Sequence, residues 1–213
     1  GACLMAEPAL VADCLRAMIE AVPDALPVTV KCRIGIDGND DYAFFARFVT
    51  TAAEAGVRVF IVHARKALLS GLSPRENREI PPLRYDVPLR LKRERPDLGV
   101  VLNGGLRSIG QAREWLPHFD AIMFGRRVCE DPWLLAELDV ALIGGVPPSR
   151  AEVVAHYADY ADRMSAAGHR SAALLRHAQT LFTGFPGAKA WRRRLADPGA
   201  RDVGAGELLR AAL

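Results

Sequence analysis

Residues 59–63 read Val59-Phe60-Ile61-Val62-His63, an apolar run that ends on an ionisable side chain. A short run of β-branched and aromatic residues predicts a buried strand. Three further runs have the same character: Val28-Thr29-Val30-Lys31, Val100-Val101-Leu102-Asn103 and Ala121-Ile122-Met123-Phe124-Gly125. Because these runs are largely apolar throughout, we expect strands that are covered on both faces, which is typical of a parallel sheet.

Amphipathic segments separate the four runs and are predicted to be helices. Pro8 suits the first turn of the first helix, and Asp40 or Asp41 can cap the second. The alternation of strand and helix predicts an α/β fold. An open doubly wound sheet and a (β/α)8 barrel both fit it, since only four of a barrel's eight strands are visible. The predicted helices cover 8–22, the segment between the cap at Asp40 or Asp41 and Gly56, 86–95, 108–116 and 126–138. The first should face the core through Leu10, Val11, Leu15, Met18, Ile19 and Val22.

After Gly144-Gly145-Val146-Pro147-Pro148 the pattern changes to helices alone. Ser149 and Glu152 have the spacing of a capping box, which predicts a helix from there to about residue 167. The sequence therefore predicts a β/α part over 1–145 and a small all-helical domain over 146–213. Its further helices are expected at 171–183, 187–195 and 204–213.

Composition and charge narrow the possible classes of protein. Half of the 213 residues are hydrophobic and a quarter are charged, which indicates a folded, soluble protein. The net charge of +3 is too small to indicate a nucleic-acid-binding protein. Its distribution is more informative, because residues 63–95 hold nine Lys or Arg against four Asp or Glu, and residues 141–213 hold ten against six. A phosphate backbone could bind there, although solvated faces fit these counts equally well.

The cysteines and histidines show no arrangement for metal binding or nucleophilic catalysis. No Cys-x-x-Cys pair occurs, and the thiols lie in apolar stretches, so we expect buried, reduced thiols of a cytoplasmic protein and no metal. No Ser/His/Asp set, Cys/His set or carboxylate pair stands out. The four cysteines are Cys3, Cys14, Cys32 and Cys129.

Polar residues end each predicted strand, at the edge where parallel β/α proteins bind ligands. Glycine turns let backbone N–H groups approach an oxyanion, and an arginine fork suits phosphate. Two successive turns of this kind predict a phosphate site, with Lys31 and His63 facing it. The strand-end residues are Lys31 and Arg33, His63 and Arg65, Asn103-Gly104-Gly105, and Gly125-Arg126.

Several motifs resemble the tRNA-dihydrouridine synthases of the A type, the class that acts at position 20 or 20a. The resemblance runs in order along essentially the whole chain, and the segment 63–83 is long enough to be specific. The motifs are Gly1-Ala2-Cys3-Leu4-Met5, the ten residues 28–37, His63-Ala64-Arg65-Lys66-Ala67, the segment 71–83, Asn103-Gly104-Gly105, Gly125-Arg126 and the segment 185–194.

The resemblance implies an FMN-binding TIM barrel followed by a helical tRNA-binding domain. Reduced FMN, recharged by NADPH, would deliver hydride to C6 of a uridine in the D-loop of tRNA, and a cysteine would protonate C5. Lys31 and His63 would contact the flavin. The resemblance assigns the flavin phosphate to Asn103, Gly104, Gly105, Gly125 and Arg126, and tRNA contacts to Arg75, Arg78, Arg176, Lys189 and Arg192.

The resemblance places the proton-donating cysteine in a Gly-Cys-Pro-Ser segment about ten residues before the match to Gly1-Ala2-Cys3-Leu4-Met5, and the 213 residues do not contain that segment. We therefore expect an N-terminally truncated enzyme: the last four strands of the barrel over 1–145, the tRNA-binding domain over 146–213, and no activity by themselves. Half a barrel would expose sheet edges, which predicts marginal stability or self-association. Two alternatives remain, a catalytically incomplete tRNA-binding remnant and another phosphate-binding β/α enzyme such as an isomerase or aldolase.

Overall fold

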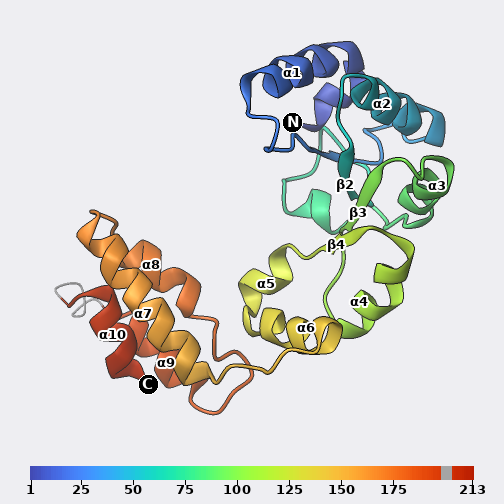
Figure 1. Ribbon diagram of the computed structural model, residues 1–213. Helices are drawn as coiled ribbons and strands as arrows, with labels where there is room; N and C mark the ends of the chain where they lie inside the picture. Colours follow the sequence, from blue (N-terminus) through green and yellow to red (C-terminus); the bar gives the residue numbers. More distant parts are fainter. Residues whose placement is uncertain (198–202) are drawn as a thin grey trace. The chain divides into compact units, whose positions relative to one another are not determined.

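The computed structural model describes residues 1–197 and 203–213 of the chain (Figure 1). Two compact units divide it, Gly1–Gly125 and Arg126–Leu213. All strands of the described residues lie in the first unit, and the second unit contains only helices among them. The predicted α/β class is confirmed, whereas the predicted domain boundary at residue 145 stays a prediction. No helix within the described ranges is long and apolar enough to cross a membrane.

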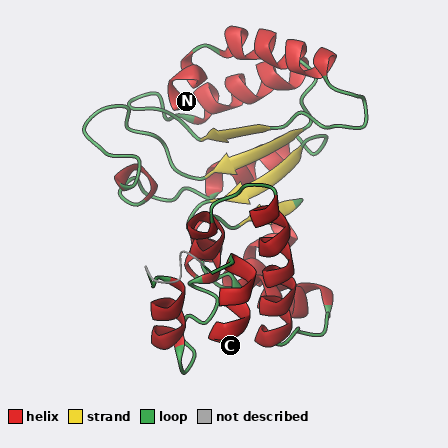
Figure 2. Ribbon diagram, turned by 90° about the vertical axis from the view of Figure 1, so that its left-hand side faces the viewer, coloured by secondary structure: helices red, strands yellow, loops and turns green. Residues whose placement is uncertain are grey.

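Four parallel strands form one sheet in the order β1-β2-β3-β4 (Figure 2). Their register aligns Arg33, His63, Asn103 and Met123 in a single row at the carboxyl end of the sheet. The first strand lies two residues later than predicted, so Lys31 stands inside it rather than at its end. The strands are β1 (Val30–Arg33), β2 (Val59–His63), β3 (Gly99–Asn103) and β4 (Ala121–Met123).

The two faces of the sheet differ in burial. One face is closed by helices and carries fully buried side chains such as Phe60, Val62 and Val100. The opposite face carries Ile61 and Val101, which are only partly buried. The strands were predicted to be covered on both faces, and helices cover one of them. A sheet of this kind is consistent with part of a TIM barrel, whose interior face is also apolar. The helices whose side chains pack into this core include α1 (Pro8–Ala21), α2 (Tyr42–Glu54) and α3 (Asp86–Glu94).

Side-chain caps begin three helices where the sequence predicts them. Asp41 accepts a hydrogen bond from the backbone N–H of Phe44 at 2.7 Å. Ser108 caps its helix in the same way, and Ser149 and Glu152 form the predicted capping box. Each cap satisfies an N–H group that the first turn leaves unpaired, so short-range chemistry accounts for these starts. The helices that they begin are α2, α4 (Ile109–Trp115) and α7 (Arg150–Ala166).

Two other helical segments differ from the prediction. The segment predicted as one helix over 126–138 forms two, α5 and α6, because Pro132 lies between them and lacks the N–H group that would continue the first. The helix predicted over 171–183 ends at Ala178. The remaining elements are α5 (Arg126–Glu130), α6 (Trp133–Ile143), α8 (Ser171–Ala178), α9 (Ala188–Leu195), α10 (Ala205–Ala212) and the short 3-10 helices η1 (Ala2–Ala6), η2 (Glu76–Arg78) and η3 (Leu116–His118).

The predicted burial of the cysteines is wrong for three of the four. Cys3, Cys14 and Cys129 are exposed, and only Cys32 is buried. Apolar sequence neighbours do not bury a helical residue, because successive residues point about 100° apart around the axis. Leu10 and Met18, expected on the buried stripe of α1, are exposed as well, because only the side of α1 that carries Ala12 and Leu15 is buried.

The thiols should therefore differ in reactivity. Burial raises the pKa of the Cys32 thiol to about 12, so almost no thiolate forms there at neutral pH. We expect a thiol reagent to modify the three exposed cysteines of the folded chain quickly and Cys32 only after unfolding. Mass spectrometry of a modification time course, with and without urea, measures this. Modification of Cys32 at the rate of the other three in the folded chain would contradict the assignment.

The second unit has a core of its own around α7. α10 packs closely against α7 at Gly206, where a Cβ would lie 2.5 Å from the carbonyl oxygen of Ala158. Arg210 on α10 bridges Asp159 and Asp162 on α7, at 2.5 and 2.9 Å. Small residues thus bring the two helices together, and exposed ion pairs flank the contact.

Candidate functional site

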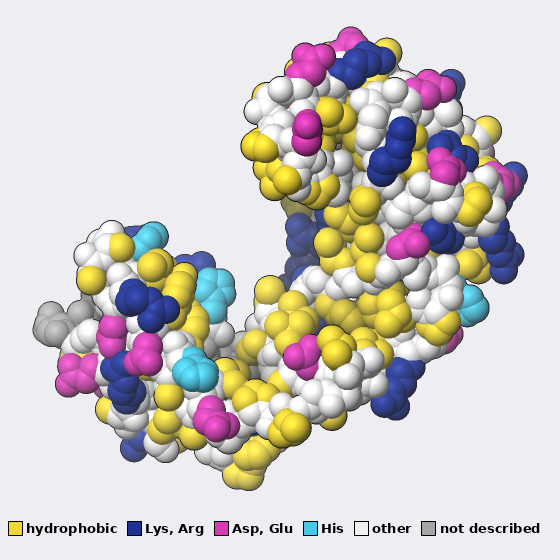
Figure 3. Space-filling view, in the orientation of Figure 1, with side chains coloured by type: hydrophobic (Ala, Val, Ile, Leu, Met, Phe, Trp, Pro, Cys, Tyr) yellow, Lys and Arg dark blue, Asp and Glu magenta, His cyan; other side chains and the backbone are white. Residues whose placement is uncertain are grey.

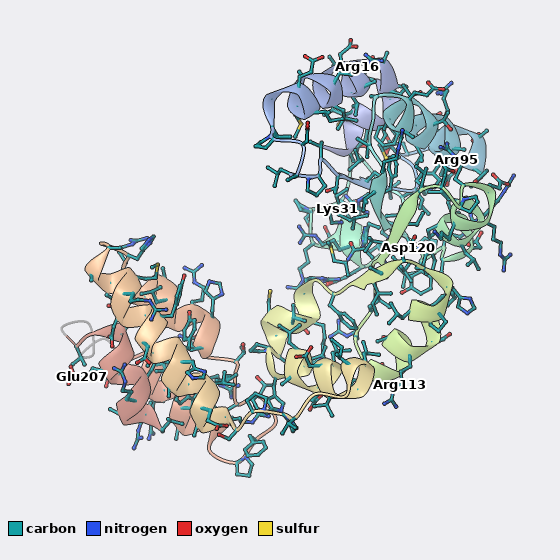
Figure 4. The ribbon with its side chains drawn as sticks, viewed as in Figure 1. Arg16, Lys31, Arg95, Arg113, Asp120 and Glu207 are labelled. Atoms are coloured by element: carbon teal, nitrogen blue, oxygen red, sulfur yellow. The ribbon has the colours of Figure 1, made fainter. Side chains whose placement is uncertain are left out.

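A chain of two hydrogen bonds crosses the sheet at its carboxyl end. Lys31 Nζ donates to Asn103 Oδ1 at 2.9 Å, and Asn103 Nδ2 donates to the carbonyl oxygen of Met123 at 2.8 Å. The Asn103 side chain is buried, and Figure 4 marks Lys31 beside the strands. These bonds connect β1, β3 and β4 and restrict where the Lys31 amine can lie. The Lys31 amine therefore lies at the start of the Asn103-Gly104-Gly105 turn.

The turn after β3 packs tightly against His63. Gly104 and Gly105 have φ angles of +109° and +69°, which L side chains rarely adopt. A Cβ on Gly104 would lie 2.7 Å from Cδ2 of His63. Tyr85 Oη donates to the carbonyl oxygen of Gly104 at 2.5 Å and holds the turn from the other side. The turn therefore needs glycine at both positions and brings its backbone against the imidazole.

The second predicted turn, Gly125-Arg126, lies where the two units meet in the sequence. Gly125 is the last residue of the first unit, and no atom lies within 4 Å of a Cβ built on it. Arg126 is the first residue of α5 in the second unit. The structure thus brings together Lys31, His63, Asn103 and the glycine pair within one unit, while Arg126 belongs to the other.

Asn77, which the sequence analysis did not single out, anchors the long loop 64–84. Its Oδ1 accepts from the N–H of Leu68 at 2.8 Å, and its Nδ2 donates to the carbonyl oxygen of Leu68 at 2.8 Å. Arg33 Nη1 donates to the carbonyl oxygens of Lys66 and Asn77 at 2.9 and 2.8 Å. The loop is therefore fastened to the end of β1. An asparagine within a polar loop carries no periodic signal that could have revealed this role.

Four cations gather at this edge: Lys31, Arg33, Arg65 and Arg78. Burial lowers the pKa of Lys31, and the charges of Arg33 and Arg78 lower it further. Burial likewise lowers the pKa of Arg33, assisted by Arg78 and Arg65. On the face that Figure 3 shows, acidic and basic side chains are interspersed over the helices of this unit. Four cations close together are therefore a local concentration of positive charge. We expect the four-cation cluster to attract an anion with several oxygens.

The residues predicted to contact tRNA lie in both units. The side chain of Arg75 is 83% exposed and pairs loosely with Glu79, at 3.7 Å. Arg78, in η2, belongs to the four-cation cluster. Arg176 on α8 and Lys189 and Arg192 on α9 are exposed in the second unit.

Alanine at Gly104 should destabilise the chain, whereas alanine at Gly125 should not. The first change forces an unfavourable φ and a contact with His63, which we expect to lower the free energy of unfolding by about 2 to 3 kcal/mol. The second meets open space and should change it by less than about 0.5 kcal/mol. Urea unfolding followed by circular dichroism compares the two. Equal effects would show that the turn after β3 is not held as described.

Comparisons with known proteins agree with the motif resemblance. A model of the dihydrouridine synthase family matches residues 1–213. The tRNA-dihydrouridine(20/20a) synthase of Xanthomonas campestris pv. campestris is 50% identical over 206 residues, 97% of this chain and 61% of that protein. The enzyme of the same name from Pseudomonas aeruginosa is 50% identical over 198 residues, 92% of this chain and 59% of that protein. The one from Vibrio cholerae is 46% identical over 209 residues, with coverages of 97% and 63%. The chain spans about three fifths of the length of these relatives.

Proposed function

The chain belongs to the dihydrouridine synthase family, and we propose that it takes part in reducing uridine to 5,6-dihydrouridine at position 20 or 20a, in the D-loop of tRNA. The observation that carries this proposal is the identity of about half the residues with synthases of that specificity, over nearly the whole chain. The same match gives no support to a sugar-phosphate isomerase or aldolase.

The residues at the strand ends fit a flavin mononucleotide. The amine of Lys31, the imidazole of His63 and the adjacent cations suit an electron-rich, anionic ligand. The backbone of Gly104 is held against His63 and that of Gly105 against Leu83 and Tyr85, and N–H groups of such a turn can approach a phosphate. We assign the phosphate to Asn103, Gly104, Gly105, Gly125 and Arg126, and the ring system to Lys31 and His63. Bound FMN would supply hydride to the uracil, with NADPH as its reductant.

The cysteines of the first unit do not lie among these groups. Cys3 and Cys14 lie on η1 and α1, and Cys32 is buried in the core beneath the helices. The strand ends therefore supply charge and hydrogen bonds but no thiol. We propose that none of these three cysteines protonates C5 of the uracil.

The basic side chains would hold the tRNA through its phosphates. We propose Arg75 and Arg78 in the first unit for this role, and Arg176, Lys189 and Arg192 in the second. Exposed cations bind a phosphate backbone by releasing its counterions, so binding should weaken steeply with salt. Because an enzyme acting on a base must take it out of its stack, contacts on the backbone around a flipped uridine are expected.

Deleting the gene in the source organism tests the proposal. We expect dihydrouridine to disappear at positions 20 and 20a of tRNA and to return on complementation with the wild-type gene, but not with Lys31→Met. Chemical mapping of dihydrouridine in purified tRNA measures both. Unchanged modification after deletion, with tRNA binding retained by the purified chain, would support the tRNA-binding remnant instead.

A further inference from the structure

An arginine in the second unit is stacked among aromatic rings. The guanidinium carbon of Arg150 lies 4.1 Å from the ring centre of Trp133 and 4.5 Å from that of Phe185. Its Nη1 donates to the carbonyl oxygen of Leu181. Burial lowers the pKa of Arg150. We call Arg150, Trp133 and Phe185 the Arg150 stack, and in it the guanidinium acts as an internal support for the rings.

Phe185 is the exposed member of the Arg150 stack. Its side chain remains 53% exposed, whereas Trp133 is partly buried and the nearby Phe182 packs on Trp191, with ring centres 4.7 Å apart. The backbone of Phe185 is held on both sides: its N–H donates to Phe182 at 2.9 Å, and its carbonyl oxygen accepts from Ala188 at 3.1 Å. The structure thus presents a rigid aromatic ring to solvent.

Unpaired positive charge follows Phe185 directly in the chain. α9 begins at Ala188, and four of its eight residues are Lys or Arg. Among the residues that the structure describes, Lys189, Arg192 and Arg193 form no ion pair, and all three are exposed. An exposed aromatic ring close in sequence to cations without an ion pair is the combination by which proteins bind unpaired nucleotides, since bases stack on the ring while phosphates meet the cations.

We propose that Phe185 is a stacking platform for an unpaired nucleobase of tRNA and that Arg150 is the positioning residue that holds its ring. The inference rests on the proposed function and deepens it, because it adds a base contact to binding that otherwise depends on phosphates. A contact of this kind tolerates any base, since every base has a planar face.

The test measures the affinity of the purified chain for an unmodified tRNA transcript at several salt concentrations. Phe185→Leu keeps an apolar side chain but removes the plane of the ring, and we expect roughly 5- to 50-fold weaker binding with an unchanged salt slope. Phe185→Trp should bind as tightly as the wild type. Arg192→Gln should instead lower the salt slope by about 0.7 to 0.9, the value for one phosphate contact.

Tyr160 supplies a matched control, because it is an exposed aromatic residue of the same unit and lies next to Asp159 in the sequence. Tyr160→Leu should leave tRNA affinity unchanged. Arg150→Met should weaken binding in the wild type and much less in the Phe185→Leu background, if its role is to hold that ring. Circular dichroism of each variant verifies folding. Phe185→Trp shows in addition whether tRNA affinity is kept when position 185 is changed but an aromatic ring remains.

The possible failures are distinguishable. If Phe185→Leu binds like the wild type while Arg192→Gln is weakened, the stacking inference is overturned and tRNA binding stands. Equal losses for Phe185→Leu and Phe185→Trp would also overturn it, since the plane would then be irrelevant. If no variant and not even the wild type binds the transcript, the proposed function itself fails.

Discussion

Asn103→Ala is expected to bind FMN roughly 10- to 100-fold more weakly than the wild type, the equivalent of one or two charge-assisted hydrogen bonds. The change removes the acceptor of the Lys31 amine, which lies 2.9 Å from Asn103 Oδ1. It also removes the donor to the carbonyl oxygen of Met123 at 2.8 Å. Without these bonds Lys31 can leave the position in which it would meet the flavin. Unpaired groups should also lower the free energy of unfolding by about 1 to 3 kcal/mol.

Flavin fluorescence during titration with the purified chain measures this affinity, and urea unfolding separates it from stability. Asn103→Asp keeps an acceptor for Lys31 but loses the donor to Met123, so we expect an intermediate affinity. Asn39→Ala is the control, because Asn39 is exposed and lies outside the strand-end contacts. Wild-type affinity in Asn103→Ala would exclude the assigned role, and absence of FMN binding by the wild type would count against the flavin proposal.

Asn77→Ala is expected to release the loop 64–84 and lower the free energy of unfolding by about 2 to 4 kcal/mol, the cost of two backbone groups losing their partner. The side chain of Asn77 is buried and bonds both the N–H and the carbonyl oxygen of Leu68, at 2.8 Å each. Because the loop carries Arg75 and Arg78, tRNA affinity should fall as well, while FMN affinity should change less.

Limited trypsin digestion reports the release directly, since cleavage after Arg75 and Arg78 requires a mobile loop. We expect faster cleavage there in Asn77→Ala and unchanged cleavage in Ser70→Ala, a change at an exposed residue of the same loop. Asn77→Asp keeps the acceptor for Leu68 N–H but places a carboxylate against carbonyl oxygens, so it should resemble the alanine variant. Wild-type cleavage in Asn77→Ala would mean that the other contacts of the loop, such as those with Arg33 and Asp37, hold it without Asn77.

The sequence by itself determined the α/β class, the family and the starts of the capped helices. These depend on short-range chemistry: apolar runs of strand length, the capping box at Ser149, and motifs that retain their order along the chain. The break between α5 and α6 at Pro132 also follows from short-range chemistry, because a proline after one helical turn predicts that the helix ends there. The sequence prediction missed this local signal.

Only the tertiary structure decided which side chains meet. Lys31 and Asn103 are 72 residues apart in the chain, and their contact depends on the register of three strands. The burial of Asn77 and the ring contacts of Arg150 depend in the same way on where distant segments pack. The exposure of Cys14 depends on which side of α1 faces the sheet. Periodicity and motifs report interactions among near neighbours, whereas these contacts arise from register and packing between segments far apart in the sequence.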